Sequence, residues 1–490
     1  MVVAERLLPT RAQRVSAPAF FALVAVNVLI VAAVVGDVGI PLLALVGIAP
    51  LAWLLSQRPQ RGLLALVALV PFDGLLDLVP HPSIIAGWKE ALAIALVLAT
   101  FVCPTEARAE GKVVWPSWWP ALAGLIALSV ATVVLFRPAA GTLGLKIAFF
   151  YVLGYVAVRR CPLSARERDR LVTILMATGV ITALYGVLQQ VVGATRLHDL
   201  GYEYNTAIRF SGSLLRSFST FEQPFPFGFF MMVVLLVCIP VALEEPNRAR
   251  NRWFLLVGVP LLGLGLLSSI VRGAWLGLAV GVAYLGTQRY RVLLLALPLG
   301  FAALLLIPPE IANRALSSSS TTERVAGWSE NLNQLVSHPF GSGAGSSGAA
   351  AQTDEIKASG ETDVGALRIT AYQPDNYYFL TAYQLGPIGV WLLLLLLAAV
   401  LSSSRRASRV LTGRDGALAA GTTAMVVGAL AASLVATYFE IFPMDVLWWL
   451  LIGVVDSAVV TAAVAPAPSS GPPTVRRAST VVPRWTSPST

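Results

Sequence analysis

An acid–amide pair, Asp375-Asn376, stands directly before a long apolar stretch and is the first candidate for chemistry. The stretch YYFLTAYQL follows the pair and ends at Gly386, with Gly389 three residues further on. A carboxylate and an amide at the start of a helix can act on a substrate while the helix fixes their position. The placement predicts an enzyme that works at a lipid surface rather than a plain membrane anchor.

Arginines that flank other apolar stretches form a second group of candidates. Arg216 lies in RSFSTFEQP, Arg272 lies in SSIVRGAWLG, and Arg324 follows a capping signal, Ser320-Thr-Thr-Glu323. A guanidinium presents a fork of donors that suits phosphate oxygens, and it stays charged at every physiological pH. Several arginines that converge on one cavity would suit a diphosphate whose lipid tail remains in the bilayer.

The elements that must position these residues are membrane helices. Apolar residues make up 56% of the 490 positions and charged residues only 12%, against about 25% charged residues in soluble proteins. Apolar segments of about 20 residues match the span of a bilayer. We therefore predict an all-α polytopic membrane protein with about fourteen transmembrane helices. The expected spans are 17–36, 38–56, 62–79, 83–102, 119–136, 140–158, 171–192, 225–243, 253–269, 273–287, 292–308, 376–402, 416–437 and 445–464.

The basic residues give this helix pattern an orientation. Roughly two thirds of the 35 Lys and Arg residues fall on alternate short segments, which the positive-inside rule places in the cytoplasm. The first span follows Arg6, Arg11 and Arg14 and is expected to be a signal anchor rather than a removed signal peptide. Both termini are then cytoplasmic, and the net charge of +9 reflects topology and lipid headgroups rather than nucleic-acid binding.

Two long outer segments divide the chain into parts. The expected parts are a cytoplasmic N-terminus (1–16), N-terminal transmembrane helices (17–192), an extracytoplasmic loop (193–224), transmembrane helices (225–308), a long extracytoplasmic loop (309–374), C-terminal transmembrane helices (375–464) and a disordered cytoplasmic tail (465–490). Apolar residues from Val325 to Val336 recur at helical spacing in the long loop. They predict a short amphipathic helix that lies on the outer membrane surface or packs on the helix bundle.

Charged residues inside the expected spans need partners, because an unpaired charge in a bilayer is costly. Asp73 and Asp77 lie at a depth similar to that of Lys89, so we expect an ion pair between Lys89 and one of these two carboxylates. With three His and three scattered Cys in the sequence, we expect no metal site and no cofactor.

Four sequence blocks resemble the O-antigen ligase and polymerase superfamily of bacterial envelope glycan assembly. They are RSFSTFEQPFPFG, SSIVRGAWLG, the stretch from Arg324-x-x-x-Trp328 to His338-Pro-Phe-Gly-Ser-Gly343, and Asn376 followed after nine residues by Gly386 and Gly389. The family's ligases have His where this chain has Asp375. The resemblance covers roughly residues 200–400 and implies an all-helical glycosyltransferase of the bacterial inner membrane, with a large outer loop and no metal or nucleotide sugar.

The resemblance also implies partners and roles for the candidate residues. The donor would be a glycan on polyprenyl diphosphate, and the acceptor a second glycan or a lipid. Arg216, Arg272 and, more weakly, Arg324 would hold the diphosphate. Asp375 and Asn376 would act near the acceptor hydroxyl, and Asp375 would be either a base or a sugar ligand. Glu222 would be a third catalytic candidate, and His338 and Arg209 could assist.

Two other functions fit the sequence less closely. A transporter or lipid-linked oligosaccharide flippase would use the charged residues within the spans, but such proteins place their sites near the midplane, often between repeated halves. The replacement of the family's His by Asp375 would also fit an inactive scaffold in an envelope-assembly complex. The Asp375 substitution favours chain polymerisation over transfer to lipid A core.

Overall fold

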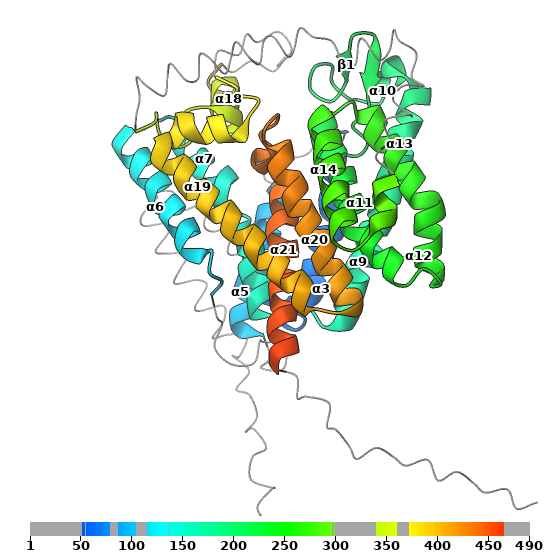
Figure 1. Ribbon diagram of the computed structural model, residues 1–490. Coiled ribbons are helices and arrows are strands. Elements are labelled where there is room, and N and C mark those ends of the chain that lie inside the picture. The colour runs from blue at the N-terminus through cyan, green and yellow to red at the C-terminus, as the bar shows by residue number, and fades with distance from the viewer. Residues whose placement is uncertain are drawn as a thin grey trace, which may run out of the picture.

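The computed structural model describes residues 51–53, 55–78, 87–103, 115–136, 138–295, 298, 340–359 and 372–464. Helices dominate these residues (Figure 1), so the structure is mostly helical with candidate membrane spans, as predicted, although it also contains a short β-hairpin. Seven helices are long and apolar enough to cross a membrane, or eight if one bent pair is a single span. The predicted count of fourteen is not confirmed, since several expected spans lie largely outside the described residues.

The membrane-length helices make up most of the described bundle. They are α6 (Trp119–Phe136), α9 (Ala165–Val192), α11 (Pro224–Glu244), the continuous run of α12 (Ala249–Trp253), η3 (Phe254–Gly258) and α13 (Val259–Ser269), then α19 (Tyr377–Val410), α20 (Gly413–Ala432) and α21 (Met444–Val464). The bent pair consists of α7 (Gly141–Phe149) and α8 (Val152–Arg160), which meet at 40°.

Shorter elements complete the described structure. They are α3 (Pro59–Leu69), η1 (Val70–Leu78), α5 (Trp88–Val102), α10 (Ala194–Asp199), the strands β1 (Arg209–Ser211) and β2 (Leu214–Arg216), α14 (Arg272–Gln288), η4 (Arg291–Leu295), α18 (Gly348–Ser359) and η5 (Tyr438–Glu440). In Figure 1 the elements α10, β1 and α18 lie at one end of the bundle, at the top of the view, which we call the loop end. The α12 helix lies toward the opposite end.

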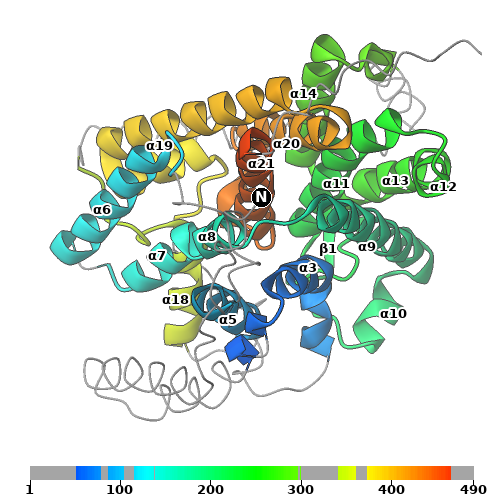
Figure 2. The same cartoon turned by 90° about the horizontal axis from the view of Figure 1, so that it is seen from below.

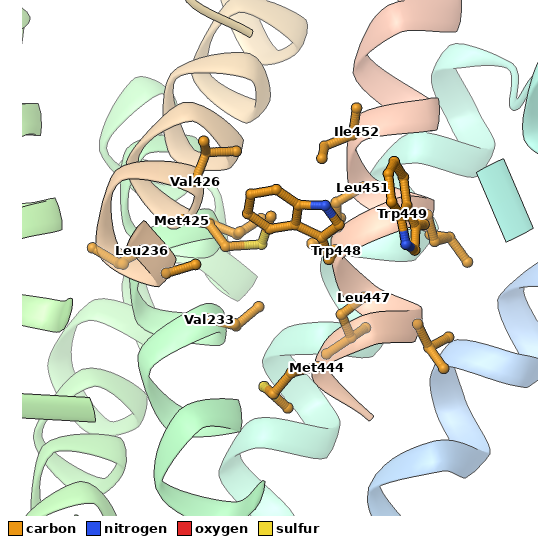
Figure 3. Close-up of a cluster of buried hydrophobic side chains, with 14 of the residues drawn as sticks. Val233, Leu236, Met425, Val426, Met444, Leu447, Trp448, Trp449, Leu451 and Ile452 are labelled. Atoms are coloured by element: carbon orange, nitrogen blue, oxygen red, sulfur yellow. The ribbon is translucent and has the colours of Figure 1, made fainter. Parts of the chain in front are cut away.

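The core of the bundle is built around α11, which is apolar on all sides and almost completely buried. Its side chains Val233 and Leu236 meet α20 and α21 in a cluster that also contains Trp448 (Figure 3). Small residues bring these helices close together, as is usual in membrane bundles. A Cβ at Gly277 of α14 would lie only 2.8 Å from the Gly428 carbonyl oxygen of α20.

One expected span, 62–79, is in fact two elements. The helix α3 ends at Leu69, and the chain continues as the tighter η1, in which Pro71 cannot donate a backbone hydrogen bond. The Pro71 carbonyl oxygen accepts a hydrogen bond from the hydroxyl of Thr220. After this break η1 packs against the segment that contains Glu222. The close contact needs a glycine at position 74, because a Cβ there would overlap the Glu222 amide nitrogen.

The charged residues in the expected spans have partners. Lys89 forms an ion pair with Asp73, which confirms one of the two predicted pairs, and the Trp88 indole nitrogen donates to the other oxygen of Asp73 (2.7 Å). Asp456 of α21, which the sequence left unexplained, accepts hydrogen bonds from Tyr155 (3.1 Å) and Ser403 (3.2 Å). These contacts neutralise or solvate carboxylates that would otherwise be costly in a bilayer.

The glycines after Asn376 bend α19. Gly386 has φ +66°, a left-handed value that breaks the helix just before Pro387. The segment around Gly341 packs into this break, where the amides of Ser342 and Gly343 donate to the carbonyl oxygens of Tyr383 and Gln384 (both 2.9 Å). The long loop is therefore fastened to the first turns of α19 by backbone contacts.

This packing predicts the effect of a methyl group at Gly341. The residue has φ +77°, and a Cβ there would lie 2.7 Å from the Gly386 amide nitrogen. We expect Gly341→Ala to lower the free energy of unfolding by about 1–3 kcal/mol. The control is Gly263→Ala in α13, where a Cβ meets nothing within 4 Å. Thermal unfolding of the two purified variants measures the difference, and equal stability would contradict the described packing.

Candidate functional site

Two of the candidate arginines lie side by side on a β-hairpin. In the antiparallel register of β1 and β2, Arg209 pairs directly with Arg216. Like charges in such a position normally destabilise a hairpin by about 0.2–1 kcal/mol. Arg209 is tied to its own turn, because its Nε donates to the Thr206 carbonyl oxygen (3.0 Å). The hairpin thus holds two guanidinium groups close together despite their repulsion.

The hairpin is fixed to the end of α13, so two of the family-like blocks are in contact. The Ser217 amide donates to the Ser268 carbonyl oxygen (2.9 Å), and Arg216 Nε donates to the Ser269 carbonyl oxygen (3.2 Å). The Arg216 guanidinium also stacks over Phe225, with 4.7 Å from Cζ to the ring centroid. Arg216 is therefore held in place by a carbonyl oxygen and an aromatic ring.

Arg272 completes a group that we call the arginine triad, Arg209, Arg216 and Arg272. It is the first residue of α14, whose first turn has no side-chain cap and adds the positive end of a helix dipole. Burial, followed by the charges of Arg209 and Arg272, lowers the pKa of Arg216 to about 10. Burial also lowers the pKa of Arg209. The triad therefore concentrates positive charge, because a guanidinium stays protonated at physiological pH.

Two glutamines of α9, which sequence reasoning missed, hold the segment after Arg216. Gln189 accepts hydrogen bonds from the amides of Phe218 (3.1 Å) and Ser219 (2.8 Å) and donates to the Ser219 carbonyl oxygen (3.0 Å). Gln190 donates to the Leu215 carbonyl oxygen (3.0 Å) and the Ser217 hydroxyl (2.7 Å). Two adjacent amides at the end of an apolar helix were the available sequence signal.

Asn376 proves to be a helix cap. Its Oδ1 accepts from the amides of Tyr378 (2.8 Å) and Phe379 (3.2 Å), which is the usual way to satisfy the first turn of a helix. Its Nδ2 donates to the Leu434 carbonyl oxygen (3.0 Å). The Asn376 side chain is buried, whereas the side chain of Asp375 just before it is exposed. Asn376 therefore fixes the backbone from which Asp375 projects.

The turn between α20 and α21, residues 433–443, connects Asp375-Asn376 to the triad. On one side it accepts hydrogen bonds from Asn376 and from the Tyr377 amide (3.0 Å to Ser433 O). On the other side it packs against Gly273, where a Cβ would lie 3.4 Å from Val435. Gly273 directly follows Arg272, so the structure places the candidate acid and one arginine of the triad beside the same short turn.

The same turn supplies a carboxylate that sequence reasoning missed. Glu440 Oε2 accepts from the Ala349 amide (3.3 Å) at the start of α18, next to Gly348, which has φ +74°. Burial raises the pKa of Glu440 to about 7, and the Ala349 hydrogen bond opposes this shift. A lone glutamate in the sequence between two spans gave little reason to single it out. In the fold it connects α18 to η5 near Tyr377.

Glu222 lies in a different part of the loop end, beside the Lys89–Asp73 ion pair. Part of Glu222 is accessible to solvent. Desolvation nevertheless raises the pKa of its carboxyl group. The positive charge of Lys89 opposes this increase, and the negative charges of Asp77 and Asp73 add to it. Lys89 Nζ in turn stands 4.1 Å from the centroid of Phe442, which belongs to the α20–α21 turn. Lys89 thus interacts both with the charge of Glu222 and with Phe442 of the α20–α21 turn.

Two predicted site residues, Arg324 and His338, lie outside the described residues. Within the described residues, no group of three His, Cys, Asp or Glu side chains could hold a metal ion. The described site therefore consists of the arginine triad, the exposed Asp375 on its Asn376 cap, and the carboxylates Glu440 and Glu222.

Comparison with known families agrees with this architecture of a helical membrane protein with a charged loop end. Residues 256–394 match the family described as O-Antigen ligase, which confirms the predicted resemblance to the O-antigen ligase superfamily. The matched region contains Arg272, Arg324, His338 and Asp375 through Gly389, but not Arg209, Arg216 or Glu440. No curated protein matches the chain.

The triad predicts a response to inorganic pyrophosphate. An anion that binds the folded protein stabilises it by mass action and relieves the repulsion among the three arginines. We expect pyrophosphate to raise the midpoint of thermal unfolding, and Arg209→Gln, Arg216→Gln or Arg272→Gln to reduce this increase by more than half. The matched control is Arg196→Gln, an exposed arginine of α10 at the same end. An unchanged pyrophosphate response in all three triad variants would contradict anion binding there.

Glu440 predicts a pH dependence of stability. Its folded pKa of about 7 lies above its ordinary value of 4.5, so its contribution is fully present at acidic pH and is lost as the pH rises through about 7. We expect Glu440→Gln to flatten the part of the stability profile between about pH 4.5 and pH 7, where the glutamate is ionised in the unfolded chain but protonated in the folded one. Glu203→Gln, at an exposed loop position, should leave the profile unchanged. A wild-type slope retained in Glu440→Gln would refute the assignment.

Proposed function

We propose that this chain is a membrane glycosyltransferase of the O-antigen ligase type. It transfers or polymerises glycans from polyprenyl-diphosphate donors at the loop end, which faces away from the cytoplasm of a bacterial cell. The family match at residues 256–394 supports the general class. The arginine triad is the single observation that carries the choice of donor.

The triad suits a diphosphate better than it suits a role in folding. The groups whose charges act on Arg216 are two other arginines, an arrangement that costs stability in the absence of an anion. A diphosphate between them would convert this repulsion into attraction. Positive charge that is already in place also stabilises the negative charge that develops on a leaving group, which is often the largest contribution to catalysis.

The proposed reaction needs a positioned base as well as the triad. An acceptor hydroxyl oxygen attacks the anomeric carbon of the donor sugar, and the bond from that carbon to the phosphate oxygen breaks. The polyprenyl diphosphate leaves with the bonding electrons and remains bound to the arginines, while the hydroxyl proton passes to a carboxylate. Asp375, Glu440 and Glu222 are the described carboxylates that could receive this proton.

Different observations support each of these three carboxylates as the group that takes the proton. Asp375 is exposed and occupies the position of the family's histidine. Glu440 has a pKa near neutrality, the value that suits a general base at physiological pH. Glu222 lies beside Lys89 and could instead bind sugar hydroxyls. We assign the proton to Asp375 or Glu440, and Asn376 holds the backbone that positions the first of these.

The alternative of a transporter loses its main support. That interpretation used the charged residues within the spans, yet Lys89 is paired with Asp73, and Asp456 is bound by Tyr155 and Ser403. The remaining candidate groups gather at the loop end rather than at the midplane, where transporters place their sites. Asp375 in place of the family's His favours polymerisation over transfer to lipid A core.

Replacement of triad residues tests the proposed function. We expect Arg216→Gln and Arg272→Gln each to lower polymer formation by about 100-fold or more, as removal of a preorganised charge at a leaving group usually does. Cells that carry either variant should accumulate lipid-linked single repeat units, which mass spectrometry detects, whereas accumulation of finished chains would identify a ligase.

The same experiment contains its control. Arg196→Gln should keep wild-type polymer, and immunoblots should show equal amounts of all variants in the membrane. Normal polymer from both Arg216→Gln and Arg272→Gln at equal expression would remove the basis of the assignment.

A further inference from the structure

A second concentration of arginines lies at the end of the bundle opposite the loop end, around a cavity of about 450 Å³. We call it the arginine-lined cavity. Its walls come from the start of α9, the end of α11 and the start of α20, and they include Arg166, Arg168, Asp169, Arg170, Arg414 and Asp415. The proposed catalytic groups lie on other elements, so this cavity belongs to a separate site.

Part of the charge around this cavity is neutralised by ion pairs. Arg168 binds Asp415 and also donates to the Leu163 carbonyl oxygen (2.6 Å). Asp169 is bound by Arg248 (2.7 Å) and Arg250 (3.0 Å), and Arg414 lies 3.4 Å from it. These contacts fix the cavity walls. They also show that a single carboxylate, Asp169, is shared among three guanidinium groups.

The remaining charge is positive. The lining contains four arginines (Arg166, Arg168, Arg170 and Arg414) and two carboxylates (Asp169 and Asp415). Within the described part of the chain, Arg166 and Arg170 take part in no ion pair, unlike Arg168 and Arg414. Arg250 binds Asp169 from outside the cavity lining, and its Nη2 is buried without a hydrogen-bond partner. The first turns of α9 and α20 border the same space and add the positive ends of two long helices. The cavity is therefore built to receive an anion.

The outward face of α9 indicates where that anion comes from. Exposed residues recur on α9 at helical spacing, namely Arg166, Arg170, Thr173, Ala177, Ile181, Leu184 and Leu188. The apolar half of this stripe is the face that lipid chains would cover. From Arg170 to Leu188 the helix rises about 27 Å, close to the thickness of the hydrocarbon core. Arg166 and Arg170 thus lie at the depth of lipid headgroups, directly in line with the acyl chains.

We propose that the arginine-lined cavity binds the phosphate-bearing headgroup of an anionic phospholipid, whose acyl chains lie along the exposed stripe of α9. Arg166 and Arg170 contact the phosphate from the membrane side, and Arg414 contacts it from the first turn of α20. Basic pockets between transmembrane helices commonly bind anionic lipids in this way. The bound lipid joins the start of α9 to the start of α20 and supplies the negative charge that the arginines lack.

Native mass spectrometry of the purified full chain tests this site. The probes are dioleoyl phosphatidylglycerol and dioleoyl phosphatidylcholine, which share acyl chains and differ in net charge. We expect phosphatidylglycerol to bind at least 10-fold more tightly than phosphatidylcholine. The double variant Arg166→Gln/Arg170→Gln should lose at least fivefold of this affinity. The matched control Arg406→Gln/Arg409→Gln removes two exposed arginines at the same end of α19 and should keep it.

The outcomes separate the possible sources of the anion. Equal phosphatidylglycerol binding by the wild type and the Arg166→Gln/Arg170→Gln variant overturns the proposal. So does displacement of the lipid by glycerol 1-phosphate at equal concentration, because the site would then recognise a soluble phosphate. None of these measurements involves the arginine triad, so they stand or fall independently of the glycosyltransferase assignment. Circular dichroism of the two double variants confirms that both are folded.

Discussion

The described loop end is organised by one short connection, the α20–α21 turn at residues 433–443. Its carbonyl oxygens accept hydrogen bonds from the Asn376 side chain and the Tyr377 amide, and its Glu440 accepts one from the Ala349 amide of α18. Because Val435 packs against Gly273, the same turn also sets the distance between α14 and α19. The groups proposed to bind the donor and to take the proton are therefore positioned by a segment that is not itself part of the family match at 256–394.

The turn can serve this purpose because the helices on either side of it are rigidly packed. Both α20 and α21 join α11 in the buried core (Figure 3), and α20 also approaches α14 through facing glycines. The view along the bundle in Figure 2 shows α11, α20 and α21 inside a ring of more peripheral helices, with α6 at the edge. A site carried on connections between such helices keeps its geometry when a bulky substrate arrives, which preorganised electrostatic catalysis requires.

The sequence predicted the class of this protein well because bilayer physics leaves few choices. Apolar segments and the Lys89–Asp73 pair follow directly from the cost of polar groups in lipid. The exact ends of the helices could not be predicted in this way. The expected span 62–79, for example, ends as an α-helix at Leu69 and continues as η1, which contains Pro71. Local sequence also could not show that Asn376 caps α19, or that Gln189 and Gln190 hold the Arg216 segment. Each of these roles depends on partners distant in the sequence.

The two ends of the bundle use arginine in opposite ways. Opposite the loop end, guanidinium groups share carboxylates such as Asp169 and Asp415, so much of their charge is neutralised within the protein. In the arginine triad, the charges acting on Arg216 are those of Arg209 and Arg272, and burial strengthens their repulsion. At the other end Arg168 binds a carboxylate, whereas the described contacts of Arg216 are a carbonyl oxygen and an aromatic ring. The placement of Arg209, Arg216 and Arg272 near one another would suit an anion that is supplied from outside the chain and must also be able to leave.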